Sequence, residues 1–204
     1  MCVGRLKPDS GAVVFNGSIL SGRPPHEINQ LGVARVFQTP EIFGELTVVE
    51  NVMIPAFARH DGAFRINAWR RARERGAVRE EAEHILDDLN LWDQRDQIVN
   101  SMSRGDKRRL ELAMCLVQEP KLLLLDEPTA GMARADTNNT IDLLKEIKAK
   151  RDITMAIIEH DMHVVFSLAD RITVLAQGTP LVEDTPANIK GHPKVREAYL
   201  GESA

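Results

Sequence analysis

The stretch Lys121-Leu-Leu-Leu-Leu-Asp-Glu-Pro-Thr-Ala-Gly131 decides how this chain is organised. Its leucine run has no polar alternation, which predicts a β-strand buried on both faces, as strands inside parallel sheets are. Asp126 and Glu127 end the run, and Pro128 prevents the strand from continuing. Open α/β sheets bind their ligands at the carboxyl ends of such strands. Two carboxylates there are costly unless a cation or a proton transfer uses them, so the stretch predicts either a reactive strand end or a core strand that runs into a solvated acidic turn.

Composition sets bounds on the class of protein. The chain has 204 residues, of which 43% are hydrophobic and 27% charged, and this balance is typical of a globular domain with a sizeable core. The net charge of −4 argues against a global basic field that would recruit nucleic acid. Cys2 and Cys115 lie far apart without metal-ligand spacing, which favours reduced thiols over a disulfide. No apolar run approaches the ~20 residues that span a bilayer, so we expect any membrane role to be peripheral.

The order of elements predicts a strand-and-helix core interrupted by a helical insertion. Before the insertion we expect a hairpin around Asn16-Gly17, a helix at 26–31 and a strand at 33–37. From 46 to 117 the pattern is helical, with an arginine-rich span, an amphipathic helix at 80–91 and a helix capped by Ser103. After the leucine strand, helices and strands alternate: helix 134–150, strand 154–158, helix 162–169, strand 171–175, a short strand around 181–183, and helices 186–190 and 193–199.

Four polar features stand at the end of a predicted strand or the start of a predicted helix. They are Gln38, the run Ser103-Arg-Gly-Asp-Lys107, the pair Asp126 and Glu127, and His160. A serine hydroxyl, a glycine such as Gly105 and a helix N-terminus together can form an anion site. Each feature also has an ordinary interpretation, because a lone glutamine can be a turn residue, a serine a helix cap and a histidine a structural side chain.

In this order the four features resemble the cassette of the ABC ATPases. The resemblance implies that Asp126 and Gln38 contact Mg²⁺, that Glu127 polarises the water attacking ATP, and that His160 contacts the γ-phosphate. Ser103 and Gly105 stand in the signature motif, which in this family acts on the nucleotide held by the opposite protomer. The motif departs from the common form in having Met102, Arg104 and Asp106.

The resemblance also implies a fold class and a domain organisation. The expected fold is α/β, a P-loop NTPase-like ABC core whose mostly parallel sheet is flanked by helices, with an inserted α-helical subdomain. Residues 1–204 are then a single incomplete nucleotide-binding domain. Its expected parts are a core at 1–43 and 118–190, a helical subdomain at 44–117, and a C-terminal helix at 191–204.

No Gly-x-x-x-x-Gly-Lys-[Ser/Thr] motif occurs in the sequence. This P-loop supplies the backbone amides and the lysine that hold the phosphates of ATP. In the family it lies shortly upstream of a segment resembling residues 1–11, and its strand runs between those expected at 154–158 and 171–175. We therefore expect the N-terminal strands and P-loop to be missing, through a misplaced start, a truncated sequence or true loss. The two neighbouring strand edges should be unpaired, and the chain alone inactive towards ATP and poorly stable.

Further residues narrow the resemblance to the branched-chain amino acid (LivG-like) importers. These are the run Ser-x-Gly-Asp-x-Arg-Arg-Leu-Glu at 103–111, the insertion Asp61–Arg79 and the terminal Ala198-Tyr-Leu-Gly-Glu202. The resemblance implies an ATP-hydrolysing subunit at the cytoplasmic face of the plasma membrane. Its partners would be membrane permease subunits, a second cassette and, indirectly, a substrate-binding protein.

Two alternatives stay open. One is a truncated cassette that gives only its signature face to a partner, and the other is a soluble cassette ATPase acting on nucleic acid or ribosomes. The six arginines between Arg65 and Arg79 could bind RNA or anionic lipid, but only Trp69 is interleaved among them and the chain is acidic. We expect a solvated helical face there and no nucleic-acid partner.

Overall fold

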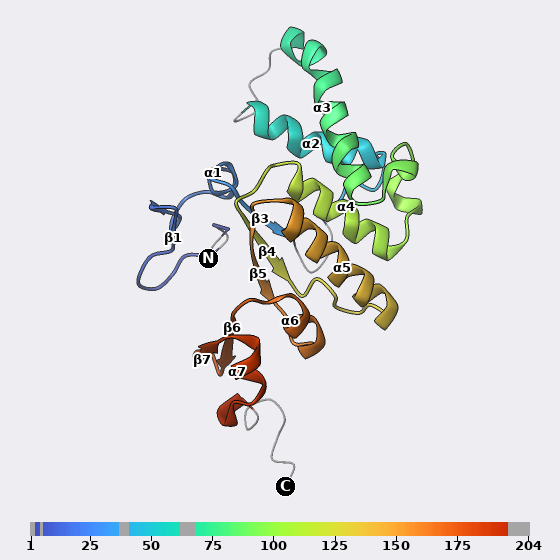
Figure 1. Cartoon of the computed structure of the whole chain (residues 1–204). Coiled ribbons are helices and arrows are strands. Elements are labelled where there is room, and N and C mark those ends of the chain that lie inside the picture. The colour runs from blue at the N-terminus through green and yellow to red at the C-terminus, as the bar shows by residue number, and fades with distance from the viewer. Residues whose placement is uncertain (1–2, 5, 37–40, 62–67, 196–204) are drawn as a thin grey trace.

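A small parallel β-sheet forms the centre of the molecule (Figure 1). The computed structural model describes residues 3–4, 6–36, 41–61 and 68–195. The sheet has the order β3 (Val33–Val36), β4 (Leu122–Asp126), β5 (Thr154–Ile158). Both pairings are parallel, with Leu124 opposite Arg35 on one side and Ala156 on the other. The expected strands at 33–37, 122–125 and 154–158 are thereby confirmed over their described residues.

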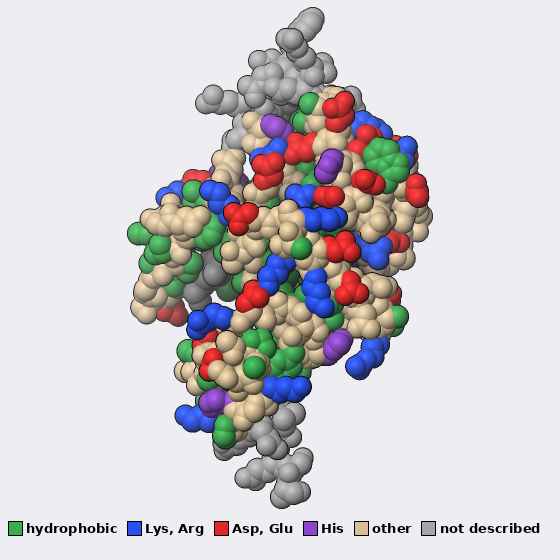
Figure 2. Space-filling model, viewed as in Figure 1, with side chains coloured by type: hydrophobic (Ala, Val, Ile, Leu, Met, Phe, Trp, Pro, Cys, Tyr) green, Lys and Arg blue, Asp and Glu red, His purple; other side chains and the backbone are tan. Residues whose placement is uncertain are grey.

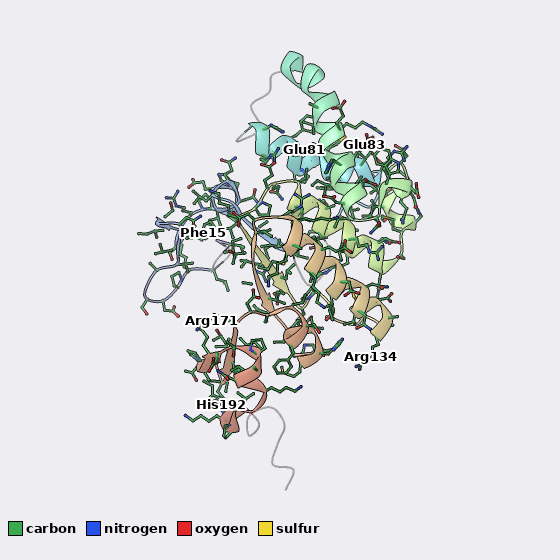
Figure 3. The ribbon with its side chains drawn as sticks, in the orientation of Figure 1. Phe15, Glu81, Glu83, Arg134, Arg171 and His192 are labelled. Atoms are coloured by element: carbon green, nitrogen blue, oxygen red, sulfur yellow. The ribbon has the colours of Figure 1, made fainter. Side chains whose placement is uncertain are left out.

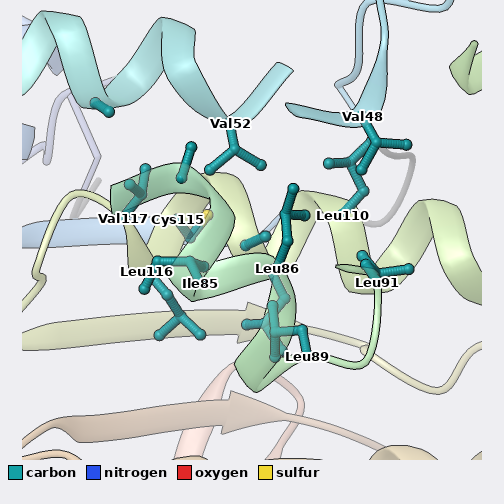
Figure 4. Packing of buried hydrophobic residues seen from close by; sticks show 14 of the residues in the cluster. Val48, Val52, Ile85, Leu86, Leu89, Leu91, Leu110, Cys115, Leu116 and Val117 are labelled. Atoms are coloured by element: carbon teal, nitrogen blue, oxygen red, sulfur yellow. The ribbon is translucent and has the colours of Figure 1, made fainter. Parts of the chain in front are cut away.

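Helices cover one face of this sheet. Helices α4 (Arg104–Leu116) and α5 (Arg134–Lys150) pack directly on it, and α2 (Val48–Asp61) and α3 (Ala68–Asp88) lie beyond α4 (Figure 1). Leu123 and Leu125 point into the cluster that these helices form with the strands. Figure 4 shows its centre, built from side chains that are almost completely removed from water: Val48, Val52, Ile85, Leu86, Leu110, Leu116 and Val117.

Among the described residues, the opposite face of the sheet is covered only near β3. There the hairpin β1 (Val14–Phe15) and β2 (Ser18–Ile19) and helix α1 (Pro25–Gln30) enclose a second cluster that Leu122 and Leu124 join. These two leucines are half-buried, and Ile158 on β5 is 68% exposed. The prediction that the leucine strand is buried on both faces was therefore wrong for one face, because no described element covers that face over β5.

The turns of both hairpins follow the local sequence. Asn16 and Gly17 both have positive φ (46° and 75°), as do Gln177 and Gly178 (49° and 79°). Two successive left-handed residues make the type I′ turn that matches the twist of two-residue hairpins. The second hairpin joins β6 (Ile172–Ala176) to β7 (Thr179–Asp184) and carries α7 (Pro186–Lys190), with α6 (Met162–Leu168) preceding it.

Strands β5 and β6 are not paired with each other. Among the described residues the sheets are β1-β2, β3-β4-β5 and β6-β7, so one edge of β5 and one edge of β6 have no strand beside them. This agrees with the expectation of two unpaired edges at these strands. The predicted helix at 193–199 lies largely outside the described residues.

In the helical region from 44 to 117, a local cap sets the start of α2, and the arginine-rich span differs from the expectation. Helix α2 begins at Val48 because Thr47 and Glu50 form a capping box, in which Glu50 accepts the Thr47 N–H at 2.9 Å and Thr47 accepts the Glu50 N–H at 3.3 Å. The arginine-rich span and the amphipathic helix are one helix, α3, and Asn90 (φ 56°) turns the chain after it. Two short 3₁₀ turns, at Trp92–Gln94 and Val99–Ser101, lead into α4. In the described part of the chain no helix has the length and apolar character to cross a membrane.

A backbone ladder ties the segment before α2 to the segment before α4. Asn100 donates its N–H to Gly44 O at 3.0 Å, and Val48 donates to Gln97 O at 3.0 Å. Asn51, fully buried, accepts the Phe43 N–H at 2.8 Å and donates to the carbonyls of Phe43 and Thr47. The loop that leads to Ser103 is thereby fixed to the start of α2.

Candidate functional site

The polar side chains predicted on β4 and β5 meet at the carboxyl edge of the sheet. Because the strands are parallel and in register, Asp126 lies opposite Ile158, and the residues that follow each strand are neighbours. Glu127 donates its N–H to Ile158 O at 2.9 Å. His160 Nδ1 is then 3.5 Å from Glu127 Oε1, so the structure brings these two predicted site residues together. The His160 side chain is 73% exposed and can meet a ligand from solvent.

Asp126 is paired with an arginine that the sequence analysis did not single out. Arg35 Nη2 lies 2.6 Å from Asp126 Oδ2, and both side chains are about one-third exposed (30% and 31%). Arg35 stands opposite Leu124, so the side chains of Arg35 and Asp126 emerge on the same face of the sheet. Arg108 of α4 donates to the Asp126 carbonyl at 3.4 Å and pairs with the buried Glu111 at 2.7 Å.

The donor set at this edge is compatible with Mg²⁺. This ion binds proteins through one or two carboxylates and keeps waters and phosphate oxygens as its other ligands. Asp126 offers such a carboxylate at an accessible position next to Glu127. Within the described residues no three acidic, histidine or cysteine side chains are grouped so that they could hold a metal ion by themselves. Gln38, the other predicted magnesium contact, lies outside the described residues.

Glu159, directly after β5, is a second residue that the sequence did not predict for this site. The side chain of Glu159 is 1% exposed, and its Oε1 accepts from Thr129 N (3.1 Å) and Thr129 Oγ1 (2.5 Å). The available sequence signal was weak: a glutamate directly before His160 and a threonine directly after Pro128. Their pairing became visible only once the register of β4 and β5 was known.

Ser103 and Gly105 lie at a different place, the N-terminus of α4. The Ser103 hydroxyl accepts the Asp106 N–H at 3.1 Å and donates to Asp106 Oδ2 at 2.7 Å, which confirms Ser103 as the helix cap. Both of these hydrogen bonds stay within the first turn of the helix. A Cβ on Gly105 would meet nothing closer than Ser103 Oγ at 3.9 Å, so the space beside Gly105 is open to an approaching molecule. The structure thus does not bring these two residues to Glu127 and His160.

A cavity of about 780 Å³ lies between α1, β3, α2 and α4, and its lining includes Arg35, the ion-pair partner of Asp126. Its lining is mainly apolar and includes Ile28, Met114 and Cys115. Burial, with a further contribution from the charge of Glu111, raises the pKa of the Cys115 thiol to about 12. At neutral pH the Cys115 thiol is therefore protonated, which makes it a poor nucleophile and a poor metal ligand.

The arginine-rich part of α3 is tied to acidic side chains where it is described. Arg79 contacts Glu83 at 2.7 Å and Asp96 at 3.2 Å, and Arg59 of α2 contacts Glu81 at 2.6 Å. Glu81 and Glu83 are labelled on α3 in Figure 3. Of the six arginines in the predicted basic span, Arg79 alone has a described side chain, and its ion pairs agree with a solvated, charge-balanced helix face.

Comparison with known proteins identifies the family. A family model described as "ABC transporter" matches residues 1–130, and one described as "Branched-chain amino acid ATP-binding cassette transporter" matches residues 180–204. The high-affinity branched-chain amino acid transport ATP-binding protein BraF of Pseudomonas aeruginosa is 38% identical over 98% of this chain and 80% of its own length. LivG of Escherichia coli, with the same description, is 36% identical over 98% of this chain and 80% of its own length.

Solved structures agree with this assignment. A crystal structure of an ATP-binding cassette of an ABC transporter in its ADP conformation superposes with a TM-score of 0.80 at 30% identity, covering 98% of this chain and 81% of that one. The cassette cbiO1 of Clostridium perfringens superposes with a TM-score of 0.78 at 25% identity, covering 95% of this chain and 73% of its own. The resemblance and the fold class expected from the sequence are thereby confirmed, and the chain belongs to the family of ABC transporter ATP-binding proteins, among the relatives of BraF and LivG.

Proposed function

We propose that this chain is the ATP-hydrolysing subunit of a membrane importer for branched-chain amino acids. The observation that carries the proposal is the approach of Glu127 Oε1 to within 3.5 Å of His160 Nδ1, next to Asp126 at the carboxyl edge of the sheet. The branched-chain amino acid transport function named for the relatives at 36–38% identity supports the class of cargo.

In this proposal Glu127 positions and polarises the water that attacks the γ-phosphate, and His160 contacts that phosphate. Phosphoryl transfer needs mainly positioning and neutralisation of charge, which an acidic residue, a polar donor and a metal ion supply. Mg²⁺, when bound together with ATP, would be held by Asp126 and Gln38 and would neutralise phosphate charge. Ser103 and Gly105 act in trans, on the nucleotide of a second cassette.

The partners follow from this role. We place the chain at the cytoplasmic face of the plasma membrane, bound to permease subunits and to a second cassette, with a substrate-binding protein acting indirectly. The helical subdomain at 44–117 and the core at 1–43 and 118–190 are the proposed working parts, followed by the C-terminal helix at 191–204. Basic and acidic side chains are interspersed on the face seen in Figure 2, which supports a role without a nucleic-acid partner.

A second candidate is a cassette that contributes only its signature face. One observation favours it: the Ser103 side chain is exposed and the space beside Gly105 is open. In that case Glu127 and Asp126 are idle, and the N-terminus of α4 completes a site on the partner cassette.

The experiment compares three variants in the chain assembled with its permease and second cassette in proteoliposomes. If the chain hydrolyses ATP, Glu127→Gln lowers ATP turnover and leucine uptake about 100-fold or more, whereas Glu146→Gln, the same change at an exposed position of α5, leaves both unchanged. If the chain supplies only a signature face, Glu127→Gln has no effect and Ser103→Ala lowers turnover. Full turnover in both the Glu127 and the Ser103 variants contradicts both candidates.

A further inference from the structure

The Glu159 carboxylate joins the two loops that carry Glu127 and His160. Its Oε1 accepts from both Thr129 N and Thr129 Oγ1, at 3.1 and 2.5 Å, in the turn directly after Glu127. Its Oε2 accepts the His160 N–H at 3.2 Å. The Glu159 side chain is 1% exposed; its two bonds to Thr129 are part-buried, and its bond to the His160 N–H lies at an exposed position. One buried carboxylate therefore fixes groups on both sides of the candidate pair.

The turn needs such support because Glu127 has an unfavourable backbone conformation. Its φ is 46°, in the left-handed region that residues with a Cβ rarely occupy. The bond from Glu127 N to Ile158 O (2.9 Å) and the bond from Ala130 N to Glu127 O (3.1 Å) hold its own peptide groups. Glu159 holds the next part of the turn through Thr129. The direction of the Glu127 side chain towards His160 thus depends on a junction between the end of β4 and the end of β5.

We infer that Glu159 is a positioning residue that sets Glu127 relative to His160, and this inference rests on the proposed role of Glu127 in ATP hydrolysis. A carboxylate suits the position because the Thr129 N–H, the Thr129 hydroxyl and the His160 N–H all donate to it. A glutamine would turn an N–H₂ group towards either the His160 N–H or the Thr129 donors, and would lose one side of the junction. Glu159 itself does not touch the reacting atoms; it acts through the two residues that do.

The sharpest variant is Thr129→Val, which keeps the shape of the side chain and removes the hydroxyl donor to Glu159. Thr129→Ser keeps that donor and is the rescue variant. Thr173→Val is the matched control, because Thr173 Oγ1 donates to Glu183 Oε2 at 3.1 Å in the distant β6–β7 hairpin. Glu159→Gln tests the junction from its other partner.

The first measurement is amide hydrogen exchange by mass spectrometry on the chain itself, which needs no ATP. We expect peptides covering 126–132 and 157–161 to exchange about tenfold faster in Thr129→Val and Glu159→Gln, because each loses a bond between a charged group and its partner. Thr129→Ser and Thr173→Val should leave both peptides at the unmodified rate. Unchanged exchange in Thr129→Val and Glu159→Gln overturns the inference, because it shows that Glu159 does not hold the turn after Glu127.

The second measurement is ATP turnover in the assembled transporter. A positioning role predicts that Thr129→Val lowers kcat about tenfold while the KM for ATP changes less than about twofold, and that Thr129→Ser restores kcat. Accelerated exchange with normal kcat means that the junction is only structural and overturns the inference. If the unmodified assembly itself shows no turnover, the proposed function fails, and the exchange result still decides whether Glu159 holds the turn.

Discussion

The two faces of the central sheet come from the same strands and have opposite environments. On the face that packs against α4 and α5, Leu123 and Leu125 are at most 2% exposed. On the other face Leu122 and Leu124 are half-buried, and Ile158 is 68% exposed. Because side chains alternate along a strand, Asp126 shares its face with Leu122 and Leu124. The carboxylate therefore emerges from the open face, where water and a ligand can reach it.

Within one sheet, the helix-covered face therefore stabilises the fold, and the open face carries the side chains of the candidate site. Close packing against the helices supplies the apolar burial that stabilises the fold, and the open face supplies charged side chains that stay hydrated. Substitutions on the two faces should therefore have different consequences, which the following experiments measure from the largest effect to the smallest.

The largest difference is expected between a core leucine and an open-face isoleucine. Leu110 of α4 is completely buried in the helix-covered cluster, so Leu110→Ala should lower the free energy of unfolding by about 3 kcal/mol through lost burial and a cavity. Ile158→Ala removes a largely exposed side chain and should change it by no more than about 0.5 kcal/mol. Urea denaturation gives both values. Similar losses at the two positions would remove the contrast between the faces.

A buried polar side chain in the helical layer should come next. Asn51→Ala leaves the Phe43 N–H and the carbonyls of Phe43 and Thr47 without their side-chain partner, and should cost about 2 kcal/mol. Asn188→Ala is the matched control: its amide donates to Asp184 Oδ1 at 2.9 Å on the exposed end of α7. The control should cost at most about 0.5 kcal/mol because water replaces the lost partner. Equal unfolding midpoints for the two variants would contradict the expected effect of burial.

The sequence predicted those parts of the fold that depend on local signals. Asn16-Gly17 determines its hairpin through the backbone preferences of asparagine and glycine, and Ser103 caps its helix through a bond within one turn. The sequence also predicted that Glu127 and His160 each follow the end of a strand; the structure brings them together because the carboxyl ends of parallel strands meet at one edge.

What the sequence did not predict depends on contacts between distant residues. The Arg35–Asp126 pair joins residues 91 positions apart, and the Thr129–Glu159 pair joins residues 30 apart, so both require the strand register. The half-exposed state of Leu122 and Leu124 depends on which elements cover a face, and a run of leucines carries no information about that.

The burial of Cys115 on the helix-covered side of the sheet should make the free energy of unfolding depend on pH. Burial raises the pKa of its thiol from an ordinary value near 9 to about 12. Between these values the folded chain keeps the proton and the unfolded chain loses it, so the free energy of unfolding falls as pH rises through this window. The contribution of Cys115 should fall by up to about 1.4 kcal/mol per pH unit. Urea denaturation of the unmodified chain and of Cys115→Ala between pH 8 and about 11 isolates it, because other groups titrate in both proteins.

The same thiol allows a direct comparison with the open face. In a Cys2→Ser background at pH 8, Cys115 should react with a thiol reagent at least about 100-fold more slowly than a thiol placed at the open face by Ile158→Cys. The rate at which the chromogenic reagent is consumed gives both values. Rapid modification of Cys115 in the folded chain would show that the cluster opens locally, and it would contradict the closed state of the helix-covered face.

The smallest effect concerns ion pairs that differ in exposure. Arg151, after α5, lies 2.7 Å from Asp88 at the end of α3, and both side chains are about one-quarter exposed (26% and 27%). Lys148 and Asp170 form a pair whose side chains are 42% and 81% exposed. A double-mutant cycle should give about 1 kcal/mol for the first pair and about 0.3 kcal/mol for the second, since water screens the second more strongly. Both values should fall between low salt and 1 M salt, and the first should fall by the smaller fraction. The Arg151–Asp88 pair joins the helical layer to the core, so a coupling energy no larger than that of Lys148–Asp170 would mean that apolar contacts alone hold the two together.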